Sequence, residues 1–247
     1  MVITDLACGG RWMSLRLAGR EWLWSRSDPD RAGVRPGDAF VDAGGLEECV
    51  PTVRGAPDHG TAWSRPWRRV GADEVAECGD FVLRRRLRVS ASVTASYRLE
   101  AAPGFRFVWA AHALLDVSPA ARVELPPGAP TRIYPDDGPS YVDDAWPAGG
   151  LDQLGPDDGT AVGAVVVGPS AVRVHDGERL ELRVHADQPT SIALWRNLAG
   201  WPVEQPYRSI GVEPMLGAVF DLATAGPGDA ATVPANGFVA WELEVSA

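Results

Sequence analysis

The sequence contains no lysine, so all 23 of its basic residues are arginines. Schiff-base catalysis and P-loop phosphate binding both use a lysine amine, and this absence excludes both. There is also no apolar run near the roughly 20 residues that a membrane-spanning helix needs. The opening residues, MVITDLACGGRW, do not combine a basic segment with a following apolar stretch. We therefore expect a cytoplasmic protein that has no membrane partner.

Cysteine is scarce, with Cys8, Cys49 and Cys78 far apart and none in a CxxC pair. Neither a disulfide framework nor a zinc motif has this spacing, so we expect no metal ion. Basic residues are outnumbered by 33 acidic ones, and the net charge is −10. This balance argues against nucleic acid as the main partner.

Alternating apolar and polar residues mark many short strands. Arg11–Leu17 runs up to Ala18–Gly19 and is followed by Glu21–Trp24, which predicts an opening hairpin. The strongest hairpin signal is Asp176–Gly177, between two alternating runs. The other predicted strands are Phe81–Val89, Val93–Ala101, Phe105–Leu115, Ala161–Val167, Ala171–His175, Arg179–Ala186, Ser191–Trp195, Tyr207–Val212, Ala218–Leu222 and Phe238–Val245.

Strands at this spacing, in a chain of 247 residues, predict an all-β fold in which large antiparallel sheets form a β-sandwich. No long segment carries a capped apolar stripe of 3.6-residue period, so helices should be few and short. Pro126–Asp158 is rich in Pro, Gly and Asp and predicts a long surface loop. Because similar strands resume after it, we expect a single domain over residues 1–247.

The segment Gly44–Arg69 looks least like scaffold. It is dense in polar and aromatic residues and follows neither the strand period nor the helix period. Long irregular segments in compact domains are usually functional or disordered, and the large apolar residues here argue against disorder. We interpret it as a site-forming loop in which His59, between Asp58 and Gly60, is functional rather than structural.

Two more candidates come from apolar strands. His112 is the one polar side chain in FVWAAHALL, where a histidine by itself is more often a satisfied core group. Glu213 in IGVEPMLG is a carboxylate among apolar residues, which predicts a solvated edge or a site that tunes its pKa. His175 and His185 flank the Asp176–Gly177 hairpin, and we expect both on the surface.

Five strings occur in the order GGLEECVPTV, PDHGTAWSRPW, FVWAAHALL, LWRNLAGWP and IGVEPMLG. They resemble the aldose 1-epimerase, or galactose mutarotase-like, superfamily, and most closely its diverged members with a DHGxxW element. The resemblance covers about Gly44 to Leu222. It implies a galactose mutarotase-like supersandwich with a sugar-binding cleft across one sheet.

The resemblance also implies residue roles. His112 matches the general acid that protonates the sugar ring oxygen, and Glu213 the general base that takes the proton of the anomeric hydroxyl. An imidazole and a carboxylate can fill these roles near neutral pH. His59 matches a second histidine that holds the sugar. Because the cycle restores both catalytic groups, no cofactor is implied.

Further residues are expected to bind the substrate. Trp63 and Trp195, with Trp67 and Trp201, offer flat apolar faces for a sugar ring, although sandwich core is about as good an interpretation of any one of them. Asn197 lies in the region where members of the superfamily use an aspartate on a sugar hydroxyl. Members that recognise sugar 6-phosphates have an arginine soon after the HG pair, and Arg65 or Arg68 is our candidate for that contact.

We therefore expect an isomerase acting on a small carbohydrate, as a monomer or homodimer. One alternative is a non-catalytic carbohydrate-binding protein that keeps the cleft. A second is a hexose-6-phosphate epimerase. A third is an acid/base isomerase that uses the same pair on a substrate other than a sugar.

Overall fold

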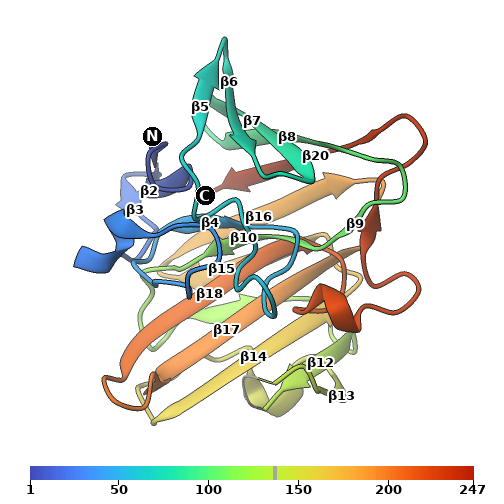
Figure 1. Cartoon of the computed structure of the whole chain (residues 1–247). Coiled ribbons are helices and arrows are strands. Elements are labelled where there is room, and N and C mark those ends of the chain that lie inside the picture. The colour runs from blue at the N-terminus through green and yellow to red at the C-terminus, as the bar shows by residue number, and fades with distance from the viewer. Residues whose placement is uncertain (136–137) are drawn as a thin grey trace.

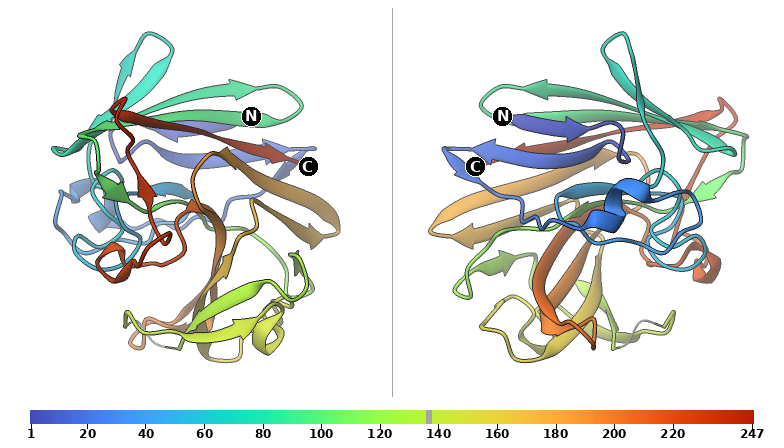
Figure 2. Two further views of the ribbon diagram at one scale, coloured as in Figure 1. Left: turned by 90° about the vertical axis from the view of Figure 1, so that its right-hand side faces the viewer. Right: turned by 60° about the vertical axis from the view of Figure 1, so that its left-hand side comes forward.

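The computed structural model describes residues 1–135 and 138–247. Within these residues, antiparallel strands form two large sheets in the order expected of a sandwich (Figures 1 and 2). The ten-stranded sheet contains β1 (Val2–Asp5), β2 (Arg11–Leu17), β3 (Arg20–Glu21), β4 (Leu46–Cys49), β10 (Trp109–Ala113), β12 (Pro130–Tyr134), β13 (Val142–Ala145), β14 (Thr160–Val167), β17 (Thr190–Trp201) and β18 (Tyr207–Leu216). The eight-stranded sheet contains β5 (Arg68–Val70), β6 (Asp73–Glu77), β7 (Phe81–Val89), β8 (Val93–Ala101), β11 (Arg122–Glu124), β15 (Ala171–Asp176), β16 (Glu178–Ala186) and β20 (Phe238–Ser246).

The remaining elements are short. β9 (Arg106–Phe107) pairs with β19 (Ala231–Thr232), and three 3-10 turns, η1 (Pro29–Gly33), η2 (Ala148–Gly150) and η3 (Leu222–Thr224), are the helical segments of the described chain. The expectation of an all-β sandwich with few short helices is confirmed. No helix in the described part of the chain is long and apolar enough to cross a membrane.

The strands form where side chains alternate between core and surface. In β8, Val93, Ala95, Tyr97 and Leu99 are buried, whereas the residues between them are partly exposed. These side chains belong to one large apolar cluster shared by the two sheets, which also includes Trp109 of the other sheet. Burying each such large side chain contributes roughly 1.5 to 3 kcal/mol.

The alternation also sorts the arginines of β7. Arg84 is half-buried and Arg86 and Arg88 are exposed, which is the pattern of a solvated strand face. Arg85 lies on the opposite face and is fully buried. The exposed positions of His175 and His185 are confirmed as well.

Three local predictions are wrong. Gly44–Arg69 is not wholly irregular, because it contains β4, which is buried along its length and lies between β2 and β10. Pro126–Asp158 contains the edge hairpin β12–β13, although Asp136 and Asp137 lie outside the described residues. Ala218–Leu222 is not a strand, since it contributes only the isolated bridge between Asp221 and Arg54 before η3 begins.

Other differences concern extent. The expected strand Phe105–Leu115 divides into β9 and β10, and β17 and β18 are longer than predicted. The strands β1, β6 and β11 were not predicted, because each is short and carries little alternation. The hairpin at Asp176–Gly177 is confirmed as β15–β16, and Gly177 supplies the positive φ of 73° that its turn requires.

The segments that flank β4 cover the outward face of the ten-stranded sheet. Figure 1 shows these blue and cyan segments in front of β10 and β18. A second, smaller apolar cluster lies on this outward face and includes Cys49, Ala110 and Met215. The outward face, and not the core between the sheets, is where the strands present side chains to a cavity.

Candidate active site

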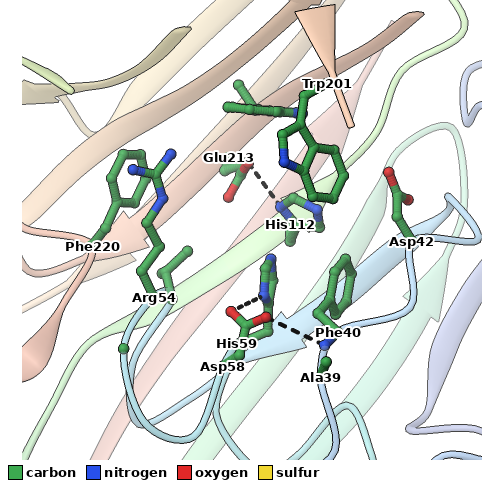
Figure 3. A pocket seen from close by; sticks show the side chains of 13 residues that line it. Ala39, Phe40, Asp42, Arg54, Asp58, His59, His112, Trp201, Glu213 and Phe220 are labelled. Carbon is green, nitrogen blue, oxygen red and sulfur yellow. Dashed lines mark hydrogen bonds and ion pairs between the residues drawn. The ribbon is translucent and has the colours of Figure 1, made fainter. Parts of the chain in front are cut away.

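A cavity of about 360 Å³ opens on the outward face of the ten-stranded sheet (Figure 3). Its floor comes from β10, β17 and β18, and its walls come from the segments around β4 and the turn after β18. The lining residues are Ala39, Phe40, Asp42, Val53, Arg54, Gly55, Asp58, His59, His112, Trp195, Trp201, Glu213 and Phe220.

His112 and Glu213 stand opposite each other on neighbouring strands. β10 and β18 are antiparallel, with Ala110 opposite Met215 and Leu114 opposite Gly211. The same register places His112 opposite Glu213, with both side chains on the outward face. Nδ1 of His112 lies 2.8 Å from Oε1 of Glu213 (Figure 3). His112 is therefore not a core histidine, because its side chain lines the cavity.

The carboxylates around His112 keep its ring charged. Burial alone lowers the pKa of His112, but Glu213 outweighs burial, and Asp42 and Glu47 add to its effect. Together they raise the pKa from the ordinary 6.5 to about 9. At neutral pH the ring is therefore protonated and can act as an acid.

The Glu213 carboxylate has little room and an unused oxygen. A Cβ added to Gly211 would lie 2.6 Å from Oε1, so only glycine at this position leaves the carboxylate where it is. Oε2 of Glu213 is buried and has no hydrogen-bond partner within the described chain. A buried acceptor left unpaired is costly, which suits an atom that meets a hydroxyl of a ligand.

The ring of His59 meets the ring of His112 edge to face at the cavity surface. Nδ1 of His59 lies 2.8 Å from Oδ1 of Asp58, and its ring stacks on Phe40 with centroids 3.6 Å apart. The centroids of the two imidazoles are 5.1 Å apart. Burial lowers the pKa of His59, and the charge of His112 lowers it further, although Asp58 opposes both. His59 is therefore the neutral imidazole of the pair.

The left-handed turn at His59 brings it to this place. His59 has a φ of 55° and Gly60 a φ of 75°. A Cβ at Gly60 would lie 2.0 Å from the carbonyl oxygen of Val50, so the turn packs directly against the end of β4. In the DHG string, Asp58 and Gly60 stabilise the turn, and His59 between them lines the cavity.

The walls combine aromatic and charged groups. Trp195 and Trp201 line one side, with ring centroids 6.1 Å apart in an edge arrangement. Arg54 lies over the ring of Phe220 at 4.7 Å from its centroid. Asp42 lines the opposite wall, and its Oδ2 accepts a hydrogen bond of 2.6 Å from the hydroxyl of Tyr207.

Five residues expected at the site do not line the cavity. One is Trp67, which is buried in the large apolar cluster and donates to the carbonyl oxygen of Ala62. Trp63 is fully buried behind Phe40 and donates to the carbonyl oxygens of Asp58 and Gly60. Asn197 is also fully buried and binds the backbone of Gly200 and Trp201. The other two point away from the cavity, because Arg65 donates to the carbonyl oxygen of Glu77 and Arg68 pairs with the carboxylate of Glu77.

The sequence did not single out Phe40, Asp42, Arg54, Asp58 or Phe220. Arg54 and Asp58 belong to the segment that was identified as site-forming, and Trp201 was named only as one of several flat faces. Phe40 and Asp42 lie in a Pro/Gly-rich stretch in which no period indicates direction. A residue in such a stretch reaches a cavity through the tertiary path of the loop, which local pattern does not encode.

No protein-family profile and no curated protein sequence matches the chain. Solved structures do match. The Slr1438 protein of Synechocystis sp. PCC 6803 aligns with a TM-score of 0.76 at 12% identity, over 99% of this chain and 90% of that one. A protein assigned as an aldose 1-epimerase from Escherichia coli K12 aligns with a TM-score of 0.74 at 14% identity, over 99% of this chain and 94% of that one. A protein assigned as a mutarotase from Salmonella typhimurium aligns with a TM-score of 0.57 at 20% identity, over 97% of this chain and 85% of that one.

At 20% identity or less, these likenesses show the fold: the chain has the β-sandwich fold of solved structures described as aldose 1-epimerases and mutarotases. It is the fold that the resemblance of the five sequence strings implied.

Proposed function

We propose that the protein is an aldose 1-epimerase-like enzyme that interconverts the anomers of a free hexose or a related carbohydrate. The observation that carries the proposal is the opposition of His112 and Glu213 at the floor of the cavity, 2.8 Å apart. Ring opening of a hemiacetal needs one group that gives a proton and one that takes a proton, both at the same C–O unit.

The reaction returns His112 and Glu213 to their starting protonation states. Protonated His112 gives a proton to the ring oxygen while Glu213 removes the proton of the anomeric hydroxyl, and the bond between C1 and the ring oxygen breaks. The open-chain carbonyl then rotates about the C1–C2 bond. In closure the ring hydroxyl adds to the other face of the carbonyl, its proton returns to His112, and Glu213 protonates the new anomeric oxygen.

The walls of the cavity suit a sugar ring. Its volume of about 360 Å³ lies at the small end of ligand pockets. The indole faces of Trp195 and Trp201 can pack on the apolar face of the ring. The carboxylate of Asp42 and the imidazole of His59 can accept or donate hydrogen bonds to sugar hydroxyls.

The arginines favour a neutral sugar over a sugar phosphate. Arg65 and Arg68, the expected phosphate ligands, contact Glu77 away from the cavity. Arg54 is the arginine at the wall, and it would be the phosphate contact in a hexose-6-phosphate epimerase. A cytoplasmic location is part of the proposal and is supported by the three free cysteines, since disulfides are rare in that compartment.

Polarimetry or exchange NMR with a panel of free aldoses and aldose 6-phosphates tests the proposal. We expect catalysed anomer exchange, and its loss by a factor of 10² to 10⁴ in Glu213→Gln and His112→Gln. His175→Gln, at an exposed position, is the matched control and should keep the wild-type rate. Sugar binding by calorimetry without any exchange would replace the proposal with a non-catalytic binding protein.

A further inference from the structure

Cys49, His59 and His112 converge beneath the cavity from three parts of the chain. Cys49 ends β4, His59 lies on the turn after it, and His112 is on β10. Their ligand atoms, the sulfur and one nitrogen of each imidazole, all lie within 4.8 Å of one another. Cys49 and His112 are buried and His59 is half-buried, so the group is closed on the sheet side and open toward the cavity.

This spacing is close to that of a coordination shell. Bonds of about 2.0 to 2.3 Å in a tetrahedral zinc site place the ligand atoms about 3.3 to 3.8 Å apart. The three atoms here therefore reach a common centre with a shift of about 1 Å in the side chains. A buried thiol between two imidazoles is also a donor set that favours zinc-like ions over magnesium or calcium.

Each histidine lies beside a carboxylate, with a hydrogen bond at His59 and an ion pair at His112. Nδ1 of His59 lies 2.8 Å from Asp58, and Nδ1 of His112 lies 2.8 Å from Glu213. Figure 3 shows the other ring nitrogen of His59 toward His112. Histidines that bind metal usually direct their second ring nitrogen to a carboxylate in this way, which fixes the ring and raises its basicity. Two such pairs facing one thiol are the second, independent indication of a cation site.

We propose that Cys49, His59 and His112 bind a thiophilic divalent ion of the Zn²⁺ class, with the fourth coordination position open to the cavity. On binding, the Cys49 thiol and the protonated His112 ring each release a proton to solvent, so that the ion is held by a thiolate and two neutral imidazoles. Burial raises the pKa of the Cys49 thiol, and the nearby carboxylates of Glu213, Glu47 and Asp58 raise it further. The same carboxylates would offset the charge of the ion once it has displaced the thiol proton. The widely spaced cysteines gave no such pattern in the sequence, because the three ligands meet only through the pairing of β4 with β10.

A bound metal ion should also inhibit the proposed reaction, and this one consequence rests on the proposed function. An ion held by His112 removes the proton that the ring would give to a sugar. Zn²⁺ should therefore inhibit anomer exchange, and a chelator should restore it. Metal binding itself is measured without turnover, so the two proposals fail separately.

Cobalt spectroscopy on the 247-residue chain tests the site directly. The protein is first treated with a chelator and dialysed. We then expect one equivalent of Co²⁺ to bind per chain and to produce a thiolate-to-cobalt charge-transfer absorption in the near ultraviolet. Zn²⁺ should displace it. Cys49→Ser should abolish the absorption, whereas Cys8→Ser and Cys78→Ser, matched controls at the other two cysteines, should keep it.

A second variant leaves the three ligands in place. Asp58→Asn should weaken Zn²⁺ binding by about 10- to 100-fold in competition with a chromogenic chelator, because it removes the partner of His59. Its control is Glu124→Gln, which removes the carboxylate beside exposed His175 and should change nothing. No charge-transfer absorption in the wild type, an absorption that survives Cys49→Ser, or equal affinity in Asp58→Asn would each overturn the proposal.

Discussion

Arg85 and Glu48 form an ion pair of 2.7 Å in which neither side chain is exposed to solvent. It lies between the two sheets, on the face of β4 opposite Cys49. Tyr97 donates its hydroxyl to Oε1 of Glu48 at 2.7 Å, and the indole of Trp109 donates to Oε2 at 2.8 Å. Strand β4 is thus fixed on its core face by charge and hydrogen bonds, while its other face serves the cavity.

Replacing Glu48 should therefore destabilise the fold strongly. Glu48→Ala leaves Arg85 charged and buried with one of its two carboxylates gone, which should lower the free energy of unfolding by about 3 to 5 kcal/mol. Chemical denaturation measures it. The control is Arg86→Ala, on the same strand as Arg85, which removes a surface ion pair with Asp73 of β6 and should cost no more than about 1 kcal/mol. Similar losses in both variants would contradict the buried network.

The sequence predicted the sandwich because β8, β16 and β20 alternate over most of their length. It did not predict β4, because Leu46–Cys49 is buried on both faces and its two glutamates look like surface residues. Their burial depends on Arg31 and Arg85, which come from distant elements. Local pattern cannot show that a charge will find its partner across a sheet.

The residues that line the candidate site were likewise predicted only in part. His59, His112, Trp195 and Glu213 line the cavity, and their roles there stay predictions. Trp63 and Asn197 do not line the cavity, because a tryptophan can pack equally well inside a loop and an asparagine can bind the backbone of its own strand. Arg54 lies one residue before Gly55 in an irregular stretch, and only the path of the chain past Phe220 directs it to the wall.

Gly211 should be required for activity more than for folding. In Gly211→Ala the new methyl group would lie 2.6 Å from Oε1 of Glu213, so the carboxylate must move away from His112. A displacement of about 1 Å in a reacting group can cost about 100-fold in rate, and we expect a loss of that order in kcat. Polarimetric rates alongside melting curves separate the two effects.

The control for Gly211 is Gly33→Ala. Gly33 lies in η1, and an added Cβ there meets no atom within 4 Å. It should keep the wild-type rate. A Gly211→Ala variant with an unchanged rate would show that Glu213 tolerates displacement and is not the base.

The His112 pair should make stability depend on pH. The pKa of His112 is 6.5 ordinarily and about 9 in the folded protein, because the neighbouring Glu213 outweighs the effect of burial. A raised pKa contributes stability that is complete below pH 6.5 and is lost as pH rises through 9. Wild type should therefore exceed His112→Gln in unfolding free energy most below pH 6.5, and the difference should shrink toward pH 9.

Urea denaturation of both proteins across that window measures the difference. His185→Gln is the control, since His185 is exposed and pairs only loosely with Glu244 at 3.5 Å. Its difference from wild type should be small throughout. A His112→Gln difference that grows with pH would mean that the ring is neutral in the folded protein.

Asn197 should act through Trp201 rather than on the sugar. Its Oδ1 accepts from the backbone N–H groups of Gly200 and Trp201 at 3.0 Å each, and its Nδ2 donates to the carbonyl oxygen of Trp201 at 2.9 Å. In Asn197→Ala these groups lose their partner, which should cost about 1 to 3 kcal/mol of stability. Trp201 then loses its fixed place at the cavity wall, so we expect KM to rise with kcat nearly unchanged.

Two comparisons decide between this role and direct sugar binding. Trp201→Ala removes the wall itself and should raise KM at least as much as Asn197→Ala does, and the double variant should be little worse than Trp201→Ala alone, because both changes act at the same place. Asn236→Ala, which removes an exposed amide that accepts from Phe238, is the control for losing an asparagine in a turn. Additive losses in the double variant would mean that Asn197 contributes to binding by a contact of its own.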